Sequence, residues 1–470
     1  MNKPSVNLVQ NVVQLKPLAN QTTRALDEMN KEYAVITVGN KVRIIHEYLH
    51  PVTSKPHFDL LSEKDFLTLT KHRPAPGTDD NSVGQFWLAH PRRRQFLTMD
   101  FFPGTVPDSV YNLWRGFGVS PSPGNCEKFW TFVRDTICSG NEDHYRYVRK
   151  WTAHMIQRPD QLPETALVLR GLQGTGKSTL AHTLGHLVEP HYIELSGTHQ
   201  VSGQFNSHLA NVLLVNANEA IWGGRKSEEG ALKAMITDPT TAIEGKGRDI
   251  VQVRNFKRLI VTTNEAWAVP MAADDRRFFV LDVSDNRKED HAYFKELVAE
   301  LQNGGFEALM HDLVSEDLGD FNPRQMPASA ASFDLKLRSA DSVTQWLYDL
   351  LSTGYHDLTC DIKSTPLMCG QYRYFANEAA VKKANESGVI VETEYLYLHY
   401  LRYGARSEPK PQFVKRLRQL LPSLRNKRVS TTPSRPRAYV LPALDDARTQ
   451  FEQNFKLQGK VPWEEPKAGL

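Results

Sequence analysis

Residues 171 to 178 read Gly-Leu-Gln-Gly-Thr-Gly-Lys-Ser, and this stretch decides the fold expected around it. In such a phosphate-binding loop, glycines let backbone N–H groups converge on phosphates, Lys177 reaches the β- and γ-phosphates, and Ser178 ligates Mg²⁺. An apolar strand over 166–169 precedes the loop and a helix begins at Ser178, so the helix dipole points at the anion. The stretch therefore predicts a site for ATP and Mg²⁺ built from Gly171, Gln173, Gly174, Thr175, Gly176, Lys177, Ser178 and Thr179.

A second apolar strand, Val212-Leu-Leu-Val, leads into Asn-Ala-Asn-Glu and brings polar groups to the same site. Phosphoryl transfer depends on positioning and charge neutralisation, so Glu219 is the expected general base that polarises water. Asn218 stands where an Asp usually supports the metal, and its neutral amide offers the cation no charge. The expected metal ligands are Ser178, Asn218 and Glu219. ATP binding is thus better supported than ATP hydrolysis. The alternative interpretation of the stretch from Val212 to Glu219 is a core strand that ends in an incidental polar turn.

Other polar residues adjoin two further apolar strands. Asn264 follows Leu259-Ile-Val-Thr-Thr and can hydrogen-bond the γ-phosphate or the attacking water. Arg276 and Arg277 come just before the strand that begins at Phe278. In a ring of subunits either arginine can stabilise transition-state charge in the neighbour's site, whereas a structural salt bridge is the alternative. The expected catalytic set is Lys177, Glu219, Asn264, Arg276 and Arg277.

The short apolar strands alternate with helical or loop stretches, which predicts an α/β core. A chain of 470 residues also exceeds one ordinary core. We expect an α+β N-terminal region over 1–110, a helical collar-like segment over 111–160, a P-loop ATPase core over 161–285, a helical subdomain over 286–345, a linker region over 346–388, a basic winged-helix-like module over 389–450 and a tail over 451–470.

The N-terminal residues predict a loose leader of about twenty residues, followed by strands at Tyr33-Ala-Val-Ile-Thr-Val and Val42-Arg-Ile-Ile around a Gly39-Asn40 turn. No run approaches the roughly 18 apolar residues of a membrane span, and the start lacks the apolar block of a secretory signal. The four cysteines lack the paired spacing of a zinc site. These features predict a cytoplasmic protein without a membrane partner.

The ordered motifs resemble those of superfamily 3 helicases and, more closely, the ATPase module of phage primase-helicases. The resemblance covers about residues 112–313, and the stretches that carry it begin at Leu169, Gln204, Asn218, Leu232, Glu244, Thr263 and Asp275. It implies an AAA+ type core that assembles into a ring, usually a homo-hexamer. Such a ring moves on single-stranded DNA, typically 3′ to 5′, in replication of a phage or mobile element within the host cytoplasm.

The resemblance also implies a β-hairpin over 242–253 whose tip touches DNA. The residues agree with this expectation, because Gly245 and Gly247 permit a tight turn and Lys246 and Arg248 supply cations for a phosphate backbone. An exposed charged turn is the alternative, since Lys and Gly are ordinary turn residues.

A basic region lies near the C-terminal end, where residues 402–437 hold eleven Lys or Arg against one acid. This imbalance indicates a polyanion partner. The region resembles a winged helix whose recognition helix spans 413–424. The expected DNA-binding residues are Lys415, Arg416, Arg418, Arg428 and Arg435, and a solvated basic face is the alternative.

The leading hypothesis is an ATP-dependent DNA helicase that acts on single-stranded and forked DNA. An ATP-switched DNA-binding initiator or loader with weak hydrolysis is the alternative that Asn218 keeps open. A P-loop kinase is disfavoured, because it needs neither a pore hairpin nor a basic module. The first 160 residues show no carboxylate motif or zinc-ligand cluster of a primase, so we expect no priming activity and a separate primase or polymerase as partner.

Overall fold

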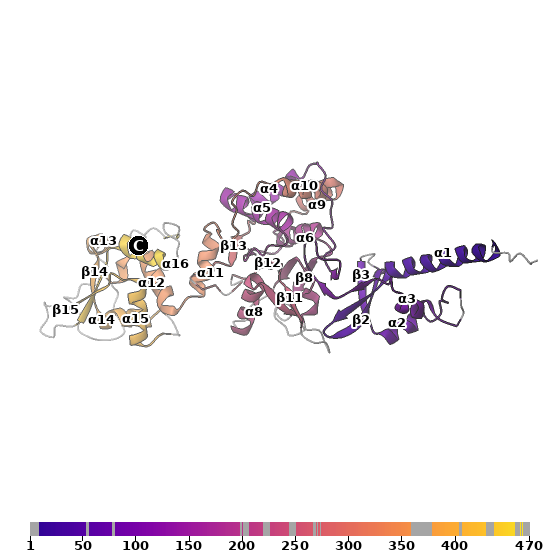
Figure 1. Ribbon diagram of the computed structural model, residues 1–470. Helices are drawn as coiled ribbons and strands as arrows, with labels where there is room; N and C mark the ends of the chain where they lie inside the picture. Colours follow the sequence, from indigo (N-terminus) through magenta and orange to yellow (C-terminus); the bar gives the residue numbers. More distant parts are fainter. Residues whose placement is uncertain are drawn as a thin grey trace, which may run out of the picture.

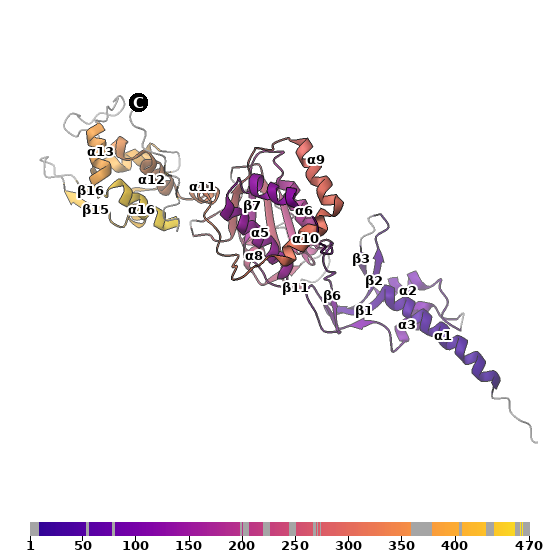
Figure 2. The ribbon, with the colours of Figure 1, turned by 90° about the horizontal axis from the view of Figure 1, so that it is seen from above.

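The computed structural model shows three units arranged in a row (Figures 1 and 2). In Figure 1 the N-terminal unit is indigo, the C-terminal unit is orange to yellow, and the central unit with the glycine-rich loop lies between them. No helix among the described residues is long and apolar enough to cross a membrane. The structure describes residues 9–52, 56–77, 80–197, 200, 206–219, 226–243, 251–266, 269, 271–272, 274–358, 378–403, 407–428, 437–455, 461 and 463.

The central unit is built on a five-stranded sheet in the order β13-β7-β12-β9-β8. Every neighbouring pair in it is parallel. All strands but β8 are largely buried, as expected for a parallel sheet covered on both faces. The predicted mixed α/β fold is confirmed, whereas β8 was not predicted from the sequence. The strands are β7 (Ala166–Arg170), β8 (Tyr192–Ser196), β9 (Leu214–Asn218), β12 (Arg258–Thr263) and β13 (Phe278–Asp282).

Successive strand residues alternate between two hydrophobic layers, one on each face of the sheet. Leu167 and Leu169 face a layer formed by α4 (Glu127–Phe132), η1 (Val133–Ile137), α5 (Glu142–Gln157), α6 (Lys177–Leu187), α9 (His291–Glu300), η3 (Leu301–Gly305) and α10 (Phe306–Ser315). Ala166 and Val168 face the other layer, to which α8 (Lys226–Thr237) and α11 (Ala330–Arg338) contribute. The short helix η2 (Ser207–Leu209) precedes β9.

The connections place β7 beside a topological switch point. The chain runs from β7 to β8 at one edge of the sheet and later passes back to β13 on the other side of β7. Ligands of such sheets bind outside the carboxyl ends of the strands at this point. Gly171, Glu219 and Asn264 directly follow β7, β9 and β12, so all three lie at the carboxyl ends of these parallel strands.

The N-terminal unit packs a sheet in the order β3-β2-β1-β4 against three helices. Its predicted hairpin is confirmed: Val38 pairs with Lys41, and Gly39 and Asn40 have φ of 54° and 60°, as a type I′ turn requires. The predicted loose leader is wrong from Val9 onward, because α1 begins there. The elements are α1 (Val9–Glu32), β1 (Tyr33–Val38), β2 (Lys41–Leu49), β3 (Pro56–Leu61), α2 (Glu63–Thr70), α3 (Val83–Ala89), β4 (Gln95–Phe96), β5 (Thr98–Asp100) and β6 (Val110–Asn112).

Two antiparallel strands, β10 (Thr240–Ile243) and β11 (Val251–Arg254), occupy the region predicted to form a hairpin. Ile243 pairs with Val251, so the two arms are confirmed. The tip with Lys246 and Arg248 lies outside the described residues.

The C-terminal unit surrounds a three-stranded antiparallel sheet in the order β14-β16-β15. Helices α14 and α15 lie between β14 and β15 in the chain, which is the element order expected of a winged helix. The elements are α12 (Ser342–Thr353), η4 (Tyr355–Leu358), α13 (Glu378–Ser387), β14 (Val389–Glu392), α14 (Thr393–Leu401), α15 (Lys410–Leu420), β15 (Arg425–Arg428), β16 (Arg437–Leu441) and α16 (Leu444–Phe455).

Two expected boundaries in this region need correction. The predicted linker 346–388 includes most of α12, whose Trp346 and Leu350 are buried in the core of the C-terminal unit. The predicted tail 451–470 includes the end of α16, and Phe451 is fully buried in the same core. Trp463 stacks on Tyr348 with ring centroids 5.4 Å apart. Apolar side chains from both segments therefore complete one core.

Candidate functional site

The glycine-rich loop depends on glycine at two positions with positive φ. Gly174 has φ of 78° and Gly176 has φ of 93°, a region that L side chains rarely adopt. A Cβ at Gly176 would lie 2.7 Å from the ring of Phe132 and 2.8 Å from that of Phe294. The loop thus enters α6 through a space that only glycine fits.

Lys177 lies inside this loop and is buried. Its Nζ donates hydrogen bonds to the carbonyl oxygens of Gly171 (2.8 Å) and Leu172 (2.6 Å). Burial lowers the pKa of Lys177 from its ordinary value, and the carboxylate of Glu219 acts in the opposite direction. An unscreened cation surrounded by backbone groups at a helix N-terminus is suited to binding an anion.

Glu219 and Asn264 lie together at the same edge of the sheet. Asn264 Nδ2 donates to Glu219 Oε1 at 3.2 Å. Glu219 has φ of 50°, which is uncommon for a residue with a side chain, and its N–H donates to the Thr262 carbonyl at 2.8 Å. The backbone hydrogen bond to Thr262 and the side-chain contact with Asn264 accompany this strained conformation and fix the carboxylate, whose Oε2 can accept from another partner.

Asn218 is held by two neighbouring strands. Its Nδ2 donates to Glu194 Oε1 at 2.9 Å, and its Oδ1 accepts from Thr262 Oγ1 at 3.0 Å. The other carboxylate oxygen of Glu194 lies 2.6 Å from His182 Nε2 on α6. Glu194 was missed from the sequence, because β8 carried no recognisable strand or motif signal.

The candidate metal ligands are all oxygen donors. Ser178 is the second residue of α6, Asn218 ends β9, and Glu219 follows it. Hydroxyl, amide and carboxylate oxygens are the donors that Mg²⁺ prefers. Within the described ranges no three His, Cys, Asp or Glu residues gather as a metal site. These oxygen donors fit the ligand preference of Mg²⁺.

Arg276 and Arg277 lie at the amino-terminal ends of the strands, opposite the glycine-rich loop. The carbonyl of Arg277 accepts a hydrogen bond from the N–H of Ala166, at the start of β7, and a strand of five residues separates this end from the loop by about 16 Å. Arg277 Nη1 lies 3.4 Å from Asp275 Oδ1, whereas Arg276 is exposed. Neither arginine therefore lies beside the loop of its own chain.

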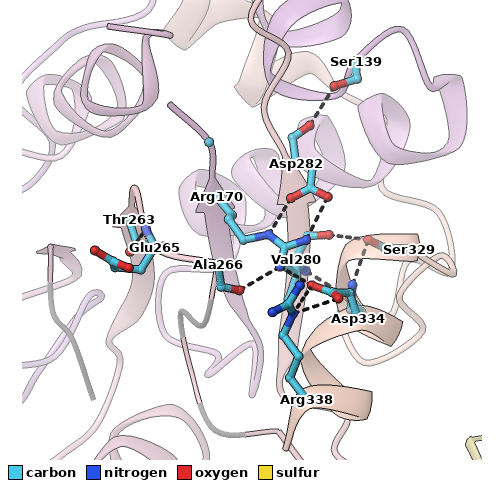
Figure 3. A network of polar contacts seen from close by, with 12 residues as sticks. Ser139, Arg170, Thr263, Glu265, Ala266, Val280, Asp282, Ser329, Asp334 and Arg338 are labelled. Carbon is cyan, nitrogen blue, oxygen red and sulfur yellow. Dashed lines mark hydrogen bonds and ion pairs between the residues drawn. The ribbon is translucent and has the colours of Figure 1, made fainter. Parts of the chain in front are cut away.

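Arg170, the last residue of β7, links the sheet edge to α11 (Figure 3). Its guanidinium donates to both oxygens of Asp282 (2.6 and 3.0 Å), to Asp334 of α11 and to the carbonyl of Ala266 (2.8 Å). Burial lowers the pKa of Arg170, but the two carboxylates outweigh it and raise that pKa above its ordinary value. Arg338 of α11 also binds Asp334. The loop's preceding residue is thereby tied to the helix that leads into the C-terminal unit.

The basic residues predicted to bind DNA differ in their surroundings. Lys415 and Arg428 are exposed, and exposed Arg418 donates to Asn426 at 2.9 Å. Arg416 is only partly exposed and pairs with Asp341 at 2.8 Å, so it is less suited to contact DNA than predicted. All four residues of β15 are exposed. Arg435 lies outside the described residues.

Comparisons with known proteins relate this chain to a family of unknown function, to part of a phage DNA primase-polymerase and to the fold of that protein's C-terminal region. A family described as being of unknown function (DUF5906) matches residues 169–277. The DNA primase-polymerase of Nitratiruptor phage NrS-1 is 33% identical over 156 residues, which are 33% of this chain and 22% of that protein. Two apo structures of the NrS-1 C-terminal region have TM-scores of 0.63 and 0.62, both at 17% identity. They cover 90% and 89% of this chain and 99% and 98% of their own.

The sequence match covers part of the relative, whereas the structural match concerns the fold of nearly the whole chain. The match to the primase-polymerase spans only 22% of that protein's length. At 17% identity, the likeness to the solved structures shows that this chain shares the fold of the NrS-1 C-terminal region. It extends over nearly the whole chain and so covers all three units.

Proposed function

We propose that this chain is an ATP-dependent DNA helicase in phage DNA replication, with an AAA+ type P-loop core that binds and hydrolyses ATP. The observation that carries the proposal is Lys177, a buried cation held by the glycine loop at the carboxyl edge of a parallel sheet. Phosphates bind at helix N-termini, and α/β sheets bind ligands at this edge. The loop lies at the N-terminus of α6 and at the carboxyl end of β7, and this position supports nucleotide binding.

The roles of the surrounding residues follow from their contacts. Lys177 exchanges its two carbonyl acceptors for the β- and γ-phosphates. Glu219 accepts a proton from the attacking water, while Asn264 occupies one carboxylate oxygen and orients the other. Ser178, Asn218 and Glu219 would hold Mg²⁺, which, when bound, neutralises charge on the phosphates.

A ring of subunits is supported by the position of the arginines. Arg276 and Arg277 lie at the edge of the sheet away from the loop of their own chain. A ring built from head-to-tail contacts brings two different surfaces of neighbouring subunits together, and an arginine on one surface can stabilise transition-state charge in the neighbour's site. We therefore propose a homo-hexamer in which Arg276 or Arg277 completes the neighbour's site.

The phage setting is supported by the 33% identity to a phage DNA primase-polymerase. The shared fold belongs to that protein's C-terminal region. Since no primase motif was found in the first 160 residues, we propose that this chain moves on single-stranded DNA while another polypeptide or segment primes synthesis. The exposed residues Lys415, Arg418 and Arg428 would contact DNA phosphates.

An ATP-switched initiator or loader is the second candidate. Asn218 favours it, because a neutral amide at the metal side of the site weakens charge stabilisation. A strand-displacement assay on a forked duplex with ATP separates the two candidates, with Lys177→Ala as the inactive control. The helicase proposal predicts ATP-dependent displacement by the wild-type protein alone. DNA-stimulated hydrolysis without displacement would instead support the initiator.

A further inference from the structure

A polar cluster on one face of the sheet connects three strands with α6. Glu194 on β8, Asn218 on β9 and Thr262 on β12 share this face, because Ser196 and Thr262 both pair with Asn218 and strand residues two apart share a face. His182 of α6 closes the cluster through its contact with Glu194. The nucleotide-site residue Asn218 is therefore in hydrogen-bond contact with a carboxylate from a strand that carries no predicted site residue.

Hydrogen-bond chemistry fixes the orientation of Asn218. A carboxylate only accepts hydrogen bonds, so the amide nitrogen must face Glu194. The amide oxygen then faces Thr262 Oγ1 and keeps a second lone pair for another donor or a metal. An aspartate at position 218 would instead place two carboxylates about 2.9 Å apart, the distance now spanned by the hydrogen bond. The neutral residue at 218 is thus matched to the acid at 194.

The cluster also lies on the metal side of the site. Ser178 and His182 are four residues apart on α6, so they share one helix face and are separated by about 6 Å along the axis. His182 contacts Glu194, so the carboxylate lies against the face of α6 that also carries Ser178. The side chain of Glu194 is 31% exposed, so water can reach it.

We infer that Glu194 supplies the negative charge that position 218 lacks, acting on the Mg²⁺ ion through its water ligands and through the orientation of Asn218. This inference rests on the proposed nucleotide site. Mg²⁺ retains several waters in protein sites, so a carboxylate that binds those waters contributes without direct ligation. Glu194 is accordingly a positioning residue, and the pair of Glu194 and Asn218 replaces the single aspartate expected at the end of β9.

The test moves the carboxylate between the two strands and measures metal binding directly. Mn²⁺ binding is followed by electron paramagnetic resonance with the β,γ-imido analogue of ATP, which is not hydrolysed. The proteins are the wild type, Glu194→Gln, the swapped double variant Glu194→Gln/Asn218→Asp, and Glu296→Gln as matched control. Glu296 pairs with Lys128 on the exposed surface of α9, so its substitution removes a carboxylate without touching the site.

The inference predicts that Glu194→Gln weakens nucleotide-dependent Mn²⁺ binding by about 10- to 100-fold, the usual effect of losing an outer-shell partner. The swapped variant should recover most of that loss, and Glu296→Gln should bind like the wild type. Equal binding by the wild type and Glu194→Gln, or a swapped variant no better than Glu194→Gln, would overturn the inference alone. Absence of nucleotide-dependent Mn²⁺ binding in the wild type would overturn the proposed function and, with it, the inference. Thermal melting of each variant excludes unfolding as the cause.

Discussion

Replacing Gly176 by alanine should destabilise the central unit and weaken nucleotide binding. The residue has φ of 93°, and a left-handed conformation costs an alanine about 1–2 kcal/mol. The new Cβ would also lie 2.7 Å from the ring of Phe132 and 2.8 Å from that of Phe294, and overpacking of this kind costs about 1–3 kcal/mol. We expect a total loss of about 3 kcal/mol, which lowers the melting temperature of a unit of this size by about 6–12 °C.

Thermal melting followed by circular dichroism measures this loss, and a fluorescent ATP analogue measures binding. Gly140→Ala is the matched control, because Gly140 has φ of 74° in the same unit but no neighbour within 4 Å of a built Cβ. It should lose only the backbone part, about 1 kcal/mol. Equal melting temperatures for the two variants would show that the rings of Phe132 and Phe294 give way, and would refute the reasoning that the loop is sterically fixed.

Three further predictions concern pH, the link to α11 and the shared site. Burial lowers the pKa of His191 to about 4, so the unfolded chain takes up a proton below about pH 6.5 while the native chain does not. The contribution of His191 to the free energy of unfolding should fall by about 3 kcal/mol between pH 6.5 and 4, and His191→Gln should reduce the pH dependence of the melts by that amount. Arg170→Ala should destabilise the protein by about 2 kcal/mol, less than a fully buried pair because its carboxylate partners are partly exposed; an unchanged melt would contradict this. Mixing Arg276→Ala or Arg277→Ala subunits with Lys177→Ala subunits should restore partial ATP hydrolysis, and no recovery in either mixture would count against a shared site.

The convergence of the candidate site residues at the carboxyl ends of the strands was largely predictable from the sequence. Short apolar runs at 166–169, 212–215 and 259–261 mark β7, β9 and β12, and polar or glycine residues follow each run within a few positions. These include Gly171 after β7, Asn218 and Glu219 at the end of β9, and Asn264 after β12. Carboxyl ends of parallel strands meet at one edge, so the residues that follow them converge without knowledge of tertiary structure. The Gly39-Asn40 turn was predictable for a similarly local reason, since both positions require positive φ.

Features that depend on long-range packing were not predictable. β8 has only one buried residue, Leu195, and its polar residues gave no periodic signal. The hydrogen bond between Glu194 and Asn218 arises only when β8 pairs with β9. The sequence analysis assigned most of α12 to a linker, although Trp346 and Leu350 lie at helical spacing. The partners of these side chains on α15 and α16 lie many residues away, so the core they complete was not visible in the local sequence.

The central claim is that the loop around Lys177 is an ATP-hydrolysing site coupled to DNA. Steady-state ATP hydrolysis, measured with and without single-stranded DNA, tests it most directly. The account predicts hydrolysis that single-stranded DNA stimulates in the wild-type protein and that Lys177→Ala abolishes while its melting profile stays native-like. Hydrolysis that persists at the wild-type rate in a folded Lys177→Ala protein, or no hydrolysis by the wild type under either condition, would contradict it.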